Sequence, residues 1–213
     1  MFTQMMEYYH QNRAFFWSSL QEHLLLSVEA VCIAIVIGVP LGILCVRKQK
    51  TSKVIESIMN TLRVIPSLAL MVLCIPIIGI GKTPAMIALI FLAVPPIVIN
   101  TVSGFESVEP SLKEVACGMG MNAKQQFFRV EVPLAMPLIL TGIRTAVTET
   151  IASTSIAAYI GAGGLGVIVF TGIGTNKDYI VLLGGLSIAV IAIVADAILA
   201  TVQSALCRFA KND

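Results

Sequence analysis

EVACGMGMNAKQQFFRVEVP, residues Glu114 to Pro133, is a polar stretch between strongly apolar segments of a 213-residue chain. Ala116 follows Glu114 by two positions and Gly120 follows it by six. Nine residues then lead to the Val-Glu-Val-Pro sequence that ends at Pro133. The apolar segments on both sides predict membrane-spanning helices. We therefore expect this stretch to lie outside the hydrocarbon layer, where another protein can contact it.

The composition of the whole chain supports a membrane protein. Hydrophobic residues make up 57% and charged residues only 12%, with a mean hydropathy of +0.91. Average soluble domains carry about 25% charged residues, so this chain has too few charges to cover a water-exposed surface. In residues 24–46, Glu29 is the only charge. A helix of that length, at about 1.5 Å per residue, crosses the roughly 30 Å hydrocarbon core.

The same apolar pattern recurs along the chain and predicts an all-α polytopic membrane helix bundle. We predict about five spans: 24–46, 58–80, 83–105, 134–158 and 179–206. Residues 161–176 are apolar but rich in glycine, which favours a re-entrant or surface segment over a sixth span. Residues 1–22 mix aromatic with polar side chains, as interfacial helices do, although a partly ordered tail is the alternative. The membrane domain then covers residues 23–207, and residues 208–213 form a cytoplasmic tail.

Lys and Arg residues predict the orientation of these spans. With the N-terminus outside and the C-terminus in the cytoplasm, only Arg13, Lys82 and Lys177 lie outside. The cytoplasmic segments then contain nine basic residues: Arg47, Lys48, Lys50, Lys53, Lys113, Lys124, Arg129, Arg208 and Lys211. This asymmetry satisfies the positive-inside rule and places the stretch from Glu114 to Pro133 in the cytoplasm.

Ionisable residues inside the predicted spans are few, and each should face protein or water. Arg63 and Arg144 lie near the cytoplasmic ends of their spans, so we expect them to extend to the interface. Glu149 lies deeper and is the candidate residue for a solute pathway, although hydrogen bonding between helices is the alternative. The other pathway candidates are polar residues of the spans: Asn100, Thr150 and Ser153, with Thr148, Thr154 and Ser155 completing a stripe around Glu149.

Helix packing has its own sequence signal. Gly38 and Gly42 stand four residues apart in the first predicted span. This GxxxG spacing predicts a close approach to another helix.

No pattern in the chain predicts a nucleotide, metal or catalytic site. Gly81, Lys82 and Thr83 resemble the end of a phosphate-binding loop, but Pro76 stands where its first glycine is required. Gly161, Gly163 and Gly166 spell GxGxxG without the acidic residue expected about twenty positions later. The five cysteines and two histidines show no metal-ligand spacing. These patterns therefore give the chain no nucleotide-binding site of its own.

The polar stretch resembles the EAA loop of ABC-importer permeases, a cytoplasmic segment that docks onto a separate ATPase subunit. Three further segments are similar to the permeases of glycine betaine, carnitine and choline importers: HLLLSVEAVCIAIVIGVPLGIL from His23, IPSLALMVLCIPIIGIG from Ile65 to Gly81, and AAYIGAGGLG from Ala157 to Gly166. The resemblance implies the type I ABC importer permease fold in the plasma membrane of a bacterium. It also implies a second permease subunit, identical or homologous, two cytoplasmic ATPases that bind ATP and Mg²⁺, and an extracytoplasmic substrate-binding protein. It implies no cofactor in this chain and no nucleic acid partner.

The resemblance also assigns roles to individual residues of an EAA-like coupling loop at 106–133. Glu114 and Ala116 would belong to a short coupling helix, Gly120 and Met121 to its turn, and Pro133 to the start of the next span. Three positions depart from the family pattern while keeping apolar character: Val115, Val130 and Val132. Four apolar side chains are expected to seat in an ATPase groove: Met119, Met121, Phe127 and Phe128.

Two other functions fit parts of the sequence. An ABC permease for an amino acid such as methionine also has an EAA loop and a GAGGLG-like segment. An ion- or proton-coupled carrier, using Glu29, Glu149 and Asp196, would need no ATPase. Uptake by the purified chain alone would distinguish the carrier from both ABC permeases.

Overall fold

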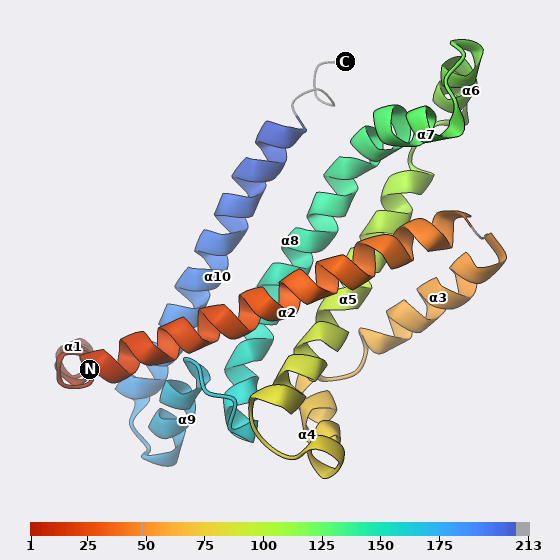
Figure 1. The fold of residues 1–213 in the computed structure, drawn as a ribbon. Coiled ribbons are helices and arrows are strands. Elements are labelled where there is room, and N and C mark those ends of the chain that lie inside the picture. The colour runs from red at the N-terminus through yellow and green to blue at the C-terminus, as the bar shows by residue number, and fades with distance from the viewer. Residues whose placement is uncertain (48, 208–213) are drawn as a thin grey trace.

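The computed structural model describes residues 1–47 and 49–207, so the expected tail at 208–213 and the basic residues Lys48, Arg208 and Lys211 lie outside the described residues. All regular elements of the described ranges are helical (Figure 1). In chain order they are α1 (Phe2–Gln11), α2 (Arg13–Arg47), α3 (Gln49–Leu62), α4 (Ser67–Ile78), α5 (Lys82–Glu106), α6 (Pro110–Gly118), α7 (Ala123–Gln126), a π-helical turn η1 (Phe127–Glu131), α8 (Val132–Ala157), a 3₁₀ turn η2 (Ala158–Ile160), α9 (Gly166–Gly174) and α10 (Asp178–Leu206).

The core of the molecule is the packing of α5 against both α2 and α8, with α10 on the other side of α8 (Figure 1). Glycines set the spacing of these helices. A Cβ atom added at Gly42 of α2 would lie 2.6 Å from the Cβ atom of Thr101 on α5. A Cβ atom added at Gly142 of α8 would lie 2.8 Å from the carbonyl oxygen of Pro96 on α5. The close approach predicted from Gly38 and Gly42 is therefore confirmed, and α5 is its partner.

Four continuous helical runs are long and apolar enough to cross a membrane: Arg13–Arg47, Lys82–Glu106, Ala123–Ile160 and Asp178–Leu206. The expected span at 58–80 is not one straight helix. Its two halves, Lys53–Leu62 and Ser67–Ile78, are bent by 93° at residues 63–66 and make a fifth span only if counted together. Pro66 explains the break, because a proline disfavours helical geometry in the residue before it.

The N-terminal segment differs from the expectation for residues 1–22. The chain breaks at Asn12, and α2 then continues without interruption from Arg13 past residue 22. Only α1 is a separate helix, and it packs on α10, with the rings of Tyr8 and Tyr179 6.3 Å apart.

The glycine-rich segment at 161–176 contains one helix. This helix, α9, has nine residues. At 1.5 Å per residue it is about 14 Å long, too short to cross the bilayer. The segment therefore does not form a sixth helical span.

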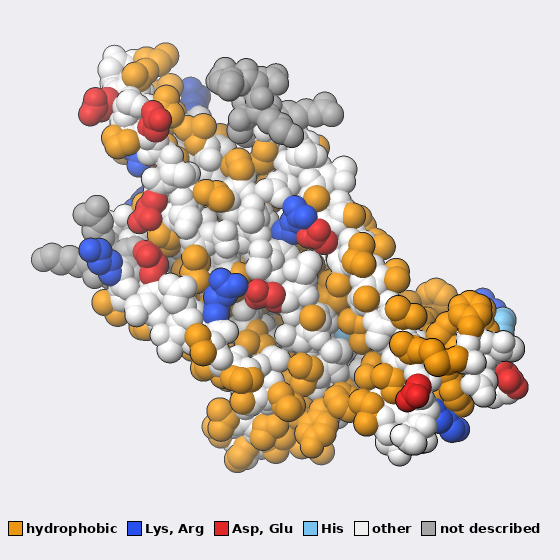
Figure 2. All heavy atoms as spheres, turned by 180° about the vertical axis from the view of Figure 1, so that it is seen from behind, with side chains coloured by type: hydrophobic (Ala, Val, Ile, Leu, Met, Phe, Trp, Pro, Cys, Tyr) orange, Lys and Arg blue, Asp and Glu red, His pale blue; other side chains and the backbone are white. Residues whose placement is uncertain are grey.

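The outer surface of α10 is apolar, and large hydrophobic side chains cover wide parts of the face shown in Figure 2. On α10 the exposed residues recur at helical spacing: Leu186, Val190, Ile193, Val194, Ile198 and Val202. Lipid chains can cover such a surface, whereas water would leave it unstable.

Candidate functional site: the coupling segment and the polar face

The segment between α5 and α8 folds into a compact unit of short helices. Glu109 precedes α6, and Pro110 is its first residue, a position where the missing N–H costs nothing. Asn122 caps α7. Its side chain accepts a hydrogen bond from the backbone N–H of Gln125 at 3.0 Å, and the Gln125 side chain accepts one from the backbone N–H of Asn122 at 2.9 Å. These local bonds explain why so polar a stretch is ordered.

Gly120 makes the turn between α6 and α7, as the family resemblance implied. Its φ is +78°, a region that costs residues other than glycine about 1–2 kcal/mol. The Gly120 amide donates to the Cys117 carbonyl at 2.9 Å, and the Met121 amide donates to the Ala116 carbonyl at 3.1 Å. Pro133 lies in the first turn of α8.

The residues of α6 divide between an exposed and a buried face. Ala116 is buried, whereas Glu114 is exposed. Three apolar side chains at helical spacing are also exposed: Leu112, Val115 and Met119. Phe128 of η1 is 68% exposed. These four apolar residues, Leu112, Val115, Met119 and Phe128, are termed the α6 apolar face below.

Phe127 does not belong to that face, because its ring is half-buried against other parts of the chain. Its ring stacks on Phe105, at the end of α5, with ring centroids 5.6 Å apart and an angle of 3°. The Arg47 guanidinium, at the end of α2, lies 4.8 Å from the same ring. Phe127 therefore connects the coupling segment to two spanning helices, and α8 continues directly from η1.

A salt bridge and a hydrogen bond hold α6 against this connection. Lys113 Nζ lies 3.6 Å from Glu131 Oε1, and the Gln126 amide nitrogen donates to the Lys113 carbonyl at 3.4 Å. These two contacts link α6 to the η1 turn and to the start of α8. Sequence patterns could not identify these partners, because they show neither which way Phe127 points nor which acid lies opposite Lys113.

The polar residues predicted on the fourth span point in different directions. Glu149 is exposed, whereas Thr150 and Thr154 are buried. The Ser27 hydroxyl of α2 donates to Thr154 Oγ1 at 2.9 Å, so that side of the stripe fastens α8 to α2. Ser153 is half-buried. Glu149 and the polar residues near it in the sequence therefore do not form one continuous stripe on α8.

Asn100 is held within the bundle. Its amide nitrogen donates to the Pro96 carbonyl of its own helix at 2.8 Å. Its Cβ atom faces Gly142 at the contact between α5 and α8. Asn100 thus lies in a helix contact and Thr150 is buried, whereas Glu149 is exposed.

Both arginines expected to reach the interface instead pair with acids. Arg63 Nη2 lies 3.3 Å from Glu149 Oε1. Arg144 on α8 binds Asp196 on α10 through two nitrogens, with Nη2 donating to Oδ2 at 2.7 Å and Nε donating to Oδ1. A nearby acid satisfies a guanidinium inside the membrane more completely than extension toward the headgroups. The face in Figure 2 shows such pairing, with Lys or Arg next to Asp or Glu at two places on a largely uncharged surface.

A second polar junction lies where α2, α5 and the loop before α9 meet. Glu22 accepts hydrogen bonds from the Gly164 amide at 3.3 Å and from Lys82 Nζ at 3.4 Å. His23 is fully buried, and its Nε2 donates to the Ile151 carbonyl at 3.1 Å. The GAGGLG segment is therefore fixed in place by the first spanning helix.

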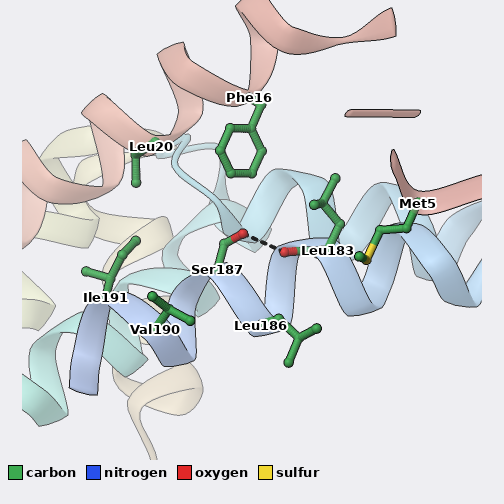
Figure 3. A pocket seen from close by; sticks show the side chains of 8 residues that line it. All are labelled: Met5, Phe16, Leu20, Leu183, Leu186, Ser187, Val190 and Ile191. Atoms are coloured by element: carbon green, nitrogen blue, oxygen red, sulfur yellow. Dashed lines mark hydrogen bonds between the residues drawn. The ribbon is translucent and has the colours of Figure 1, made fainter. Parts of the chain in front are cut away.

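The apolar pocket in Figure 3 does not suit a polar solute. It has a volume of about 300 Å³ and lies between the N-terminal helices and α10. Its one polar side chain is Ser187, whose hydroxyl donates to the Leu183 carbonyl at 2.7 Å. No polar group in this pocket is left to bind a solute, and a lipid chain fits its chemistry better.

These features define a class of protein: a polytopic helical membrane subunit with a structured loop of short helices between two of its spans. The chain belongs to the family of binding-protein-dependent transport system inner membrane components, whose model matches residues 34–206. It is a non-catalytic, multi-pass permease subunit of the inner membrane, and a separate subunit uses the ATP. The transport system also includes a binding protein.

Curated relatives cover almost the entire chain. The glycine betaine/carnitine/choline transport system permease protein OpuCB of Bacillus subtilis (strain 168) is 36% identical over 94% of this chain and 93% of its own length. The osmoprotectant import permease protein OsmW of Salmonella typhimurium is 40% identical, covering 92% of this chain and 94% of its own length.

A solved structure confirms the fold. An inward-facing structure of the MetNI methionine ABC transporter aligns with a TM-score of 0.81 at 21% identity, covering 92% of this chain and 98% of that one. The expected permease fold is thereby confirmed. At this identity the likeness carries the fold alone.

Proposed function

We propose that this chain forms half of the pathway of an ATP-driven importer for quaternary-ammonium osmoprotectants: glycine betaine, carnitine and choline. The observation that carries the solute class is the similarity, across nearly the whole chain, to permeases named for these compounds. The methionine alternative is supported by the EAA loop and the GAGGLG-like segment, which do not distinguish the two solutes, and by a shared fold at 21–24% identity. The acids invoked for an ion-coupled carrier do not favour it, because Glu149 and Asp196 are already paired with arginines.

The α6 apolar face is the proposed docking site for the ATPase. Leu112, Val115 and Met119 project from α6 and its C-cap, as the anchors of helix-in-groove contacts do, and Phe128 adds an apolar side chain from η1. With the N-terminus outside, this face lies in the cytoplasm, where the ATPase is located. ATP binding would draw two such loops together, and Phe127 and the Lys113–Glu131 salt bridge would convey this movement to the spans.

Glu149 marks the proposed pathway. Its side chain is 44% exposed although it lies well inside α8. An ionised group at this depth faces water or protein. We assign the uncovered side of α8 to the space between this chain and a second permease subunit, identical or homologous. The binding protein would deliver the solute to the outer end of this space.

A pair of glycine variants tests the coupling role. Gly118 and Gly120 both have open space around them, but only Gly120 has a positive φ. Gly120→Ala should therefore strain the turn by about 1–2 kcal/mol, which is about a 5- to 30-fold loss of the docking conformation. Gly118→Ala, the control, should stay within about twofold of the wild type, because it adds a favourable helix residue.

The measurement is ATP-driven uptake of glycine betaine, carnitine and choline by proteoliposomes that contain this chain, its ATPase and its binding protein. Affinity for the ATPase is measured alongside. Equal uptake and equal ATPase affinity for the two variants would remove Gly120 from the coupling role. Uptake of none of the three solutes by the wild type would reject the proposed solute class.

A further inference from the structure

The salt bridge between Arg63 and Glu149 lies deep in the membrane-spanning region. Glu149 is 17 residues after the start of α8 at Val132 and eight residues before its end at Ala157. At 1.5 Å per residue these separations are about 26 Å and about 12 Å. The side chains of Arg63 and Glu149 are nevertheless 42% and 44% exposed. This chain leaves the space beside the ion pair unfilled.

The pair uses little of its bonding capacity. Its single contact joins Arg63 Nη2 and Glu149 Oε1 at 3.3 Å. A guanidinium has five N–H donors, and a carboxylate accepts at both oxygens. Among residues 1–47 and 53–207, whose side chains the structure describes, no other hydrogen-bond partner is found for these two side chains. Both ions can therefore bind a further group from the open side.

The second ion pair of the spans is different and serves as an internal reference. Arg144 and Asp196 bind through two nitrogens and both carboxylate oxygens. This fork-to-fork geometry is the strongest that the two groups can form. The pair fastens α10 to α8. The side chains of Arg144 and Asp196 are also exposed, by 35% and 38%, so the contrast lies in the bonding. The bonding singles out Arg63 and Glu149 as the pair that is open to exchange.

The two partners also differ in how firmly the backbone holds them. Glu149 lies inside the continuous helix α8. Arg63 lies in the non-helical break between α3 and α4, where the helical path turns by 93°. Rotation about residues 63–66 can therefore move the guanidinium relative to the carboxylate without unwinding a helix.

We propose that Arg63 and Glu149 form a recognition site for a zwitterionic solute, an inference that rests on the proposed function. The solute's carboxylate binds Arg63, and its quaternary ammonium group lies against Glu149. Glycine betaine and carnitine carry both charges, whereas choline carries only the cation. A zwitterion exchanges with the protein's own ion pair and leaves no charge unpaired at this depth. Choline leaves Arg63 without a partner, so the site favours zwitterions.

Uptake by the complete importer in proteoliposomes tests this assignment, with KM measured separately for glycine betaine and choline. Arg63→Gln should raise the KM for glycine betaine about tenfold, because it removes about one charge-assisted hydrogen bond to the solute. It should change the KM for choline less than about threefold, because choline has no carboxylate to bind Arg63. Glu149→Gln should raise both. Arg63→Lys keeps the charge without the planar fork, and it should raise the glycine betaine KM by an intermediate factor. The double variant Arg144→Gln with Asp196→Asn is the control and should leave the ratio of the two KM values unchanged.

The outcomes separate this inference from the proposed function. If Arg63→Gln raises the KM for both solutes by the same factor, or leaves the KM for glycine betaine unchanged, the ion pair only holds α8 to the break at residues 63–66. If Arg63→Gln fails to assemble, Arg63→Lys decides by the same comparison of the two KM values. A wild type that transports choline but no zwitterion overturns the inference and leaves the proposed function standing. A wild type that transports none of these solutes rejects the proposed function itself.

Discussion

Replacing Gly142 with alanine should destabilise the helix core by an amount that the structure sets. The added Cβ atom would lie 2.6 Å from the Cβ atom of Asn100 and 2.8 Å from the Pro96 carbonyl oxygen, whereas ordinary contacts begin at 3.4 Å. Since the carbonyl oxygen and the Cβ atom are both fixed by the α5 backbone, α5 and α8 would have to separate locally by about 0.6–0.8 Å. Overpacking of this kind costs about 1–3 kcal/mol. For a chain of this size, 1 kcal/mol corresponds to about 2–4 °C in Tm. The expected decrease is therefore about 2–12 °C.

Gly185→Ala is the matched control for this prediction. Gly185 also lies in a spanning helix, but a Cβ atom added there meets nothing within 4 Å. Alanine should leave Tm unchanged or raise it slightly, because it is a better helix former than glycine. Thermal unfolding of both purified variants in the same detergent gives the comparison. A Gly142→Ala variant as stable as Gly185→Ala would show that the α5–α8 contact is not limited by backbone distance, and would refute the packing argument.

Two further predictions concern the ion pair of α10 and the loop before α9. Arg144→Gln should lower the yield of folded subunit, measured by gel filtration, because it leaves Asp196 unpaired. Adding Asp196→Asn should restore most of that yield. Equal yields for the single and double variants would argue against a role of this ion pair in holding α10 to α8. Gly163→Ala should speed deuterium exchange at the Gly164 amide, because its Cβ atom would displace the Glu22 carboxylate that accepts from that amide. Gly161→Ala is the control, with an equally positive φ but open space, and similar exchange in both variants would contradict the mechanism.

Apolar length was sufficient to predict most of the membrane domain from the sequence. The continuous helices correspond to four of the five predicted spans. The bend at 63–66 was not predicted, because hydropathy measures how apolar a segment is and not the direction of its axis. The continuation of α2 through residues 13–22 was missed for a related reason. Polar and aromatic residues there suggested an interface, yet a helix can leave the membrane without ending.

The candidate site was harder to predict because pairing depends on tertiary structure. The turn at Gly120 and the start of α8 near Pro133 agree with what the family resemblance implied. Their part in ATPase coupling stays a prediction, as does the role of Glu149 in the pathway. Sequence showed that Arg63 and Arg144 lie in spans, but it contained no information on the acids opposite them. The stacking of Phe127 on Phe105 could not be predicted for the same reason, since a short helix with several apolar residues does not reveal which one points inward.

The glycine contacts of the core restrict how this subunit can move. Where Cβ-sized gaps are absent, as at Gly42 and Gly142, neighbouring helices cannot slide along each other without a clash. The helices α2, α5 and α8 should therefore keep their mutual arrangement through the transport cycle. Displacement is left to the break at residues 63–66, between α3 and α4. The subunit therefore combines a rigid helix core with one flexible connection.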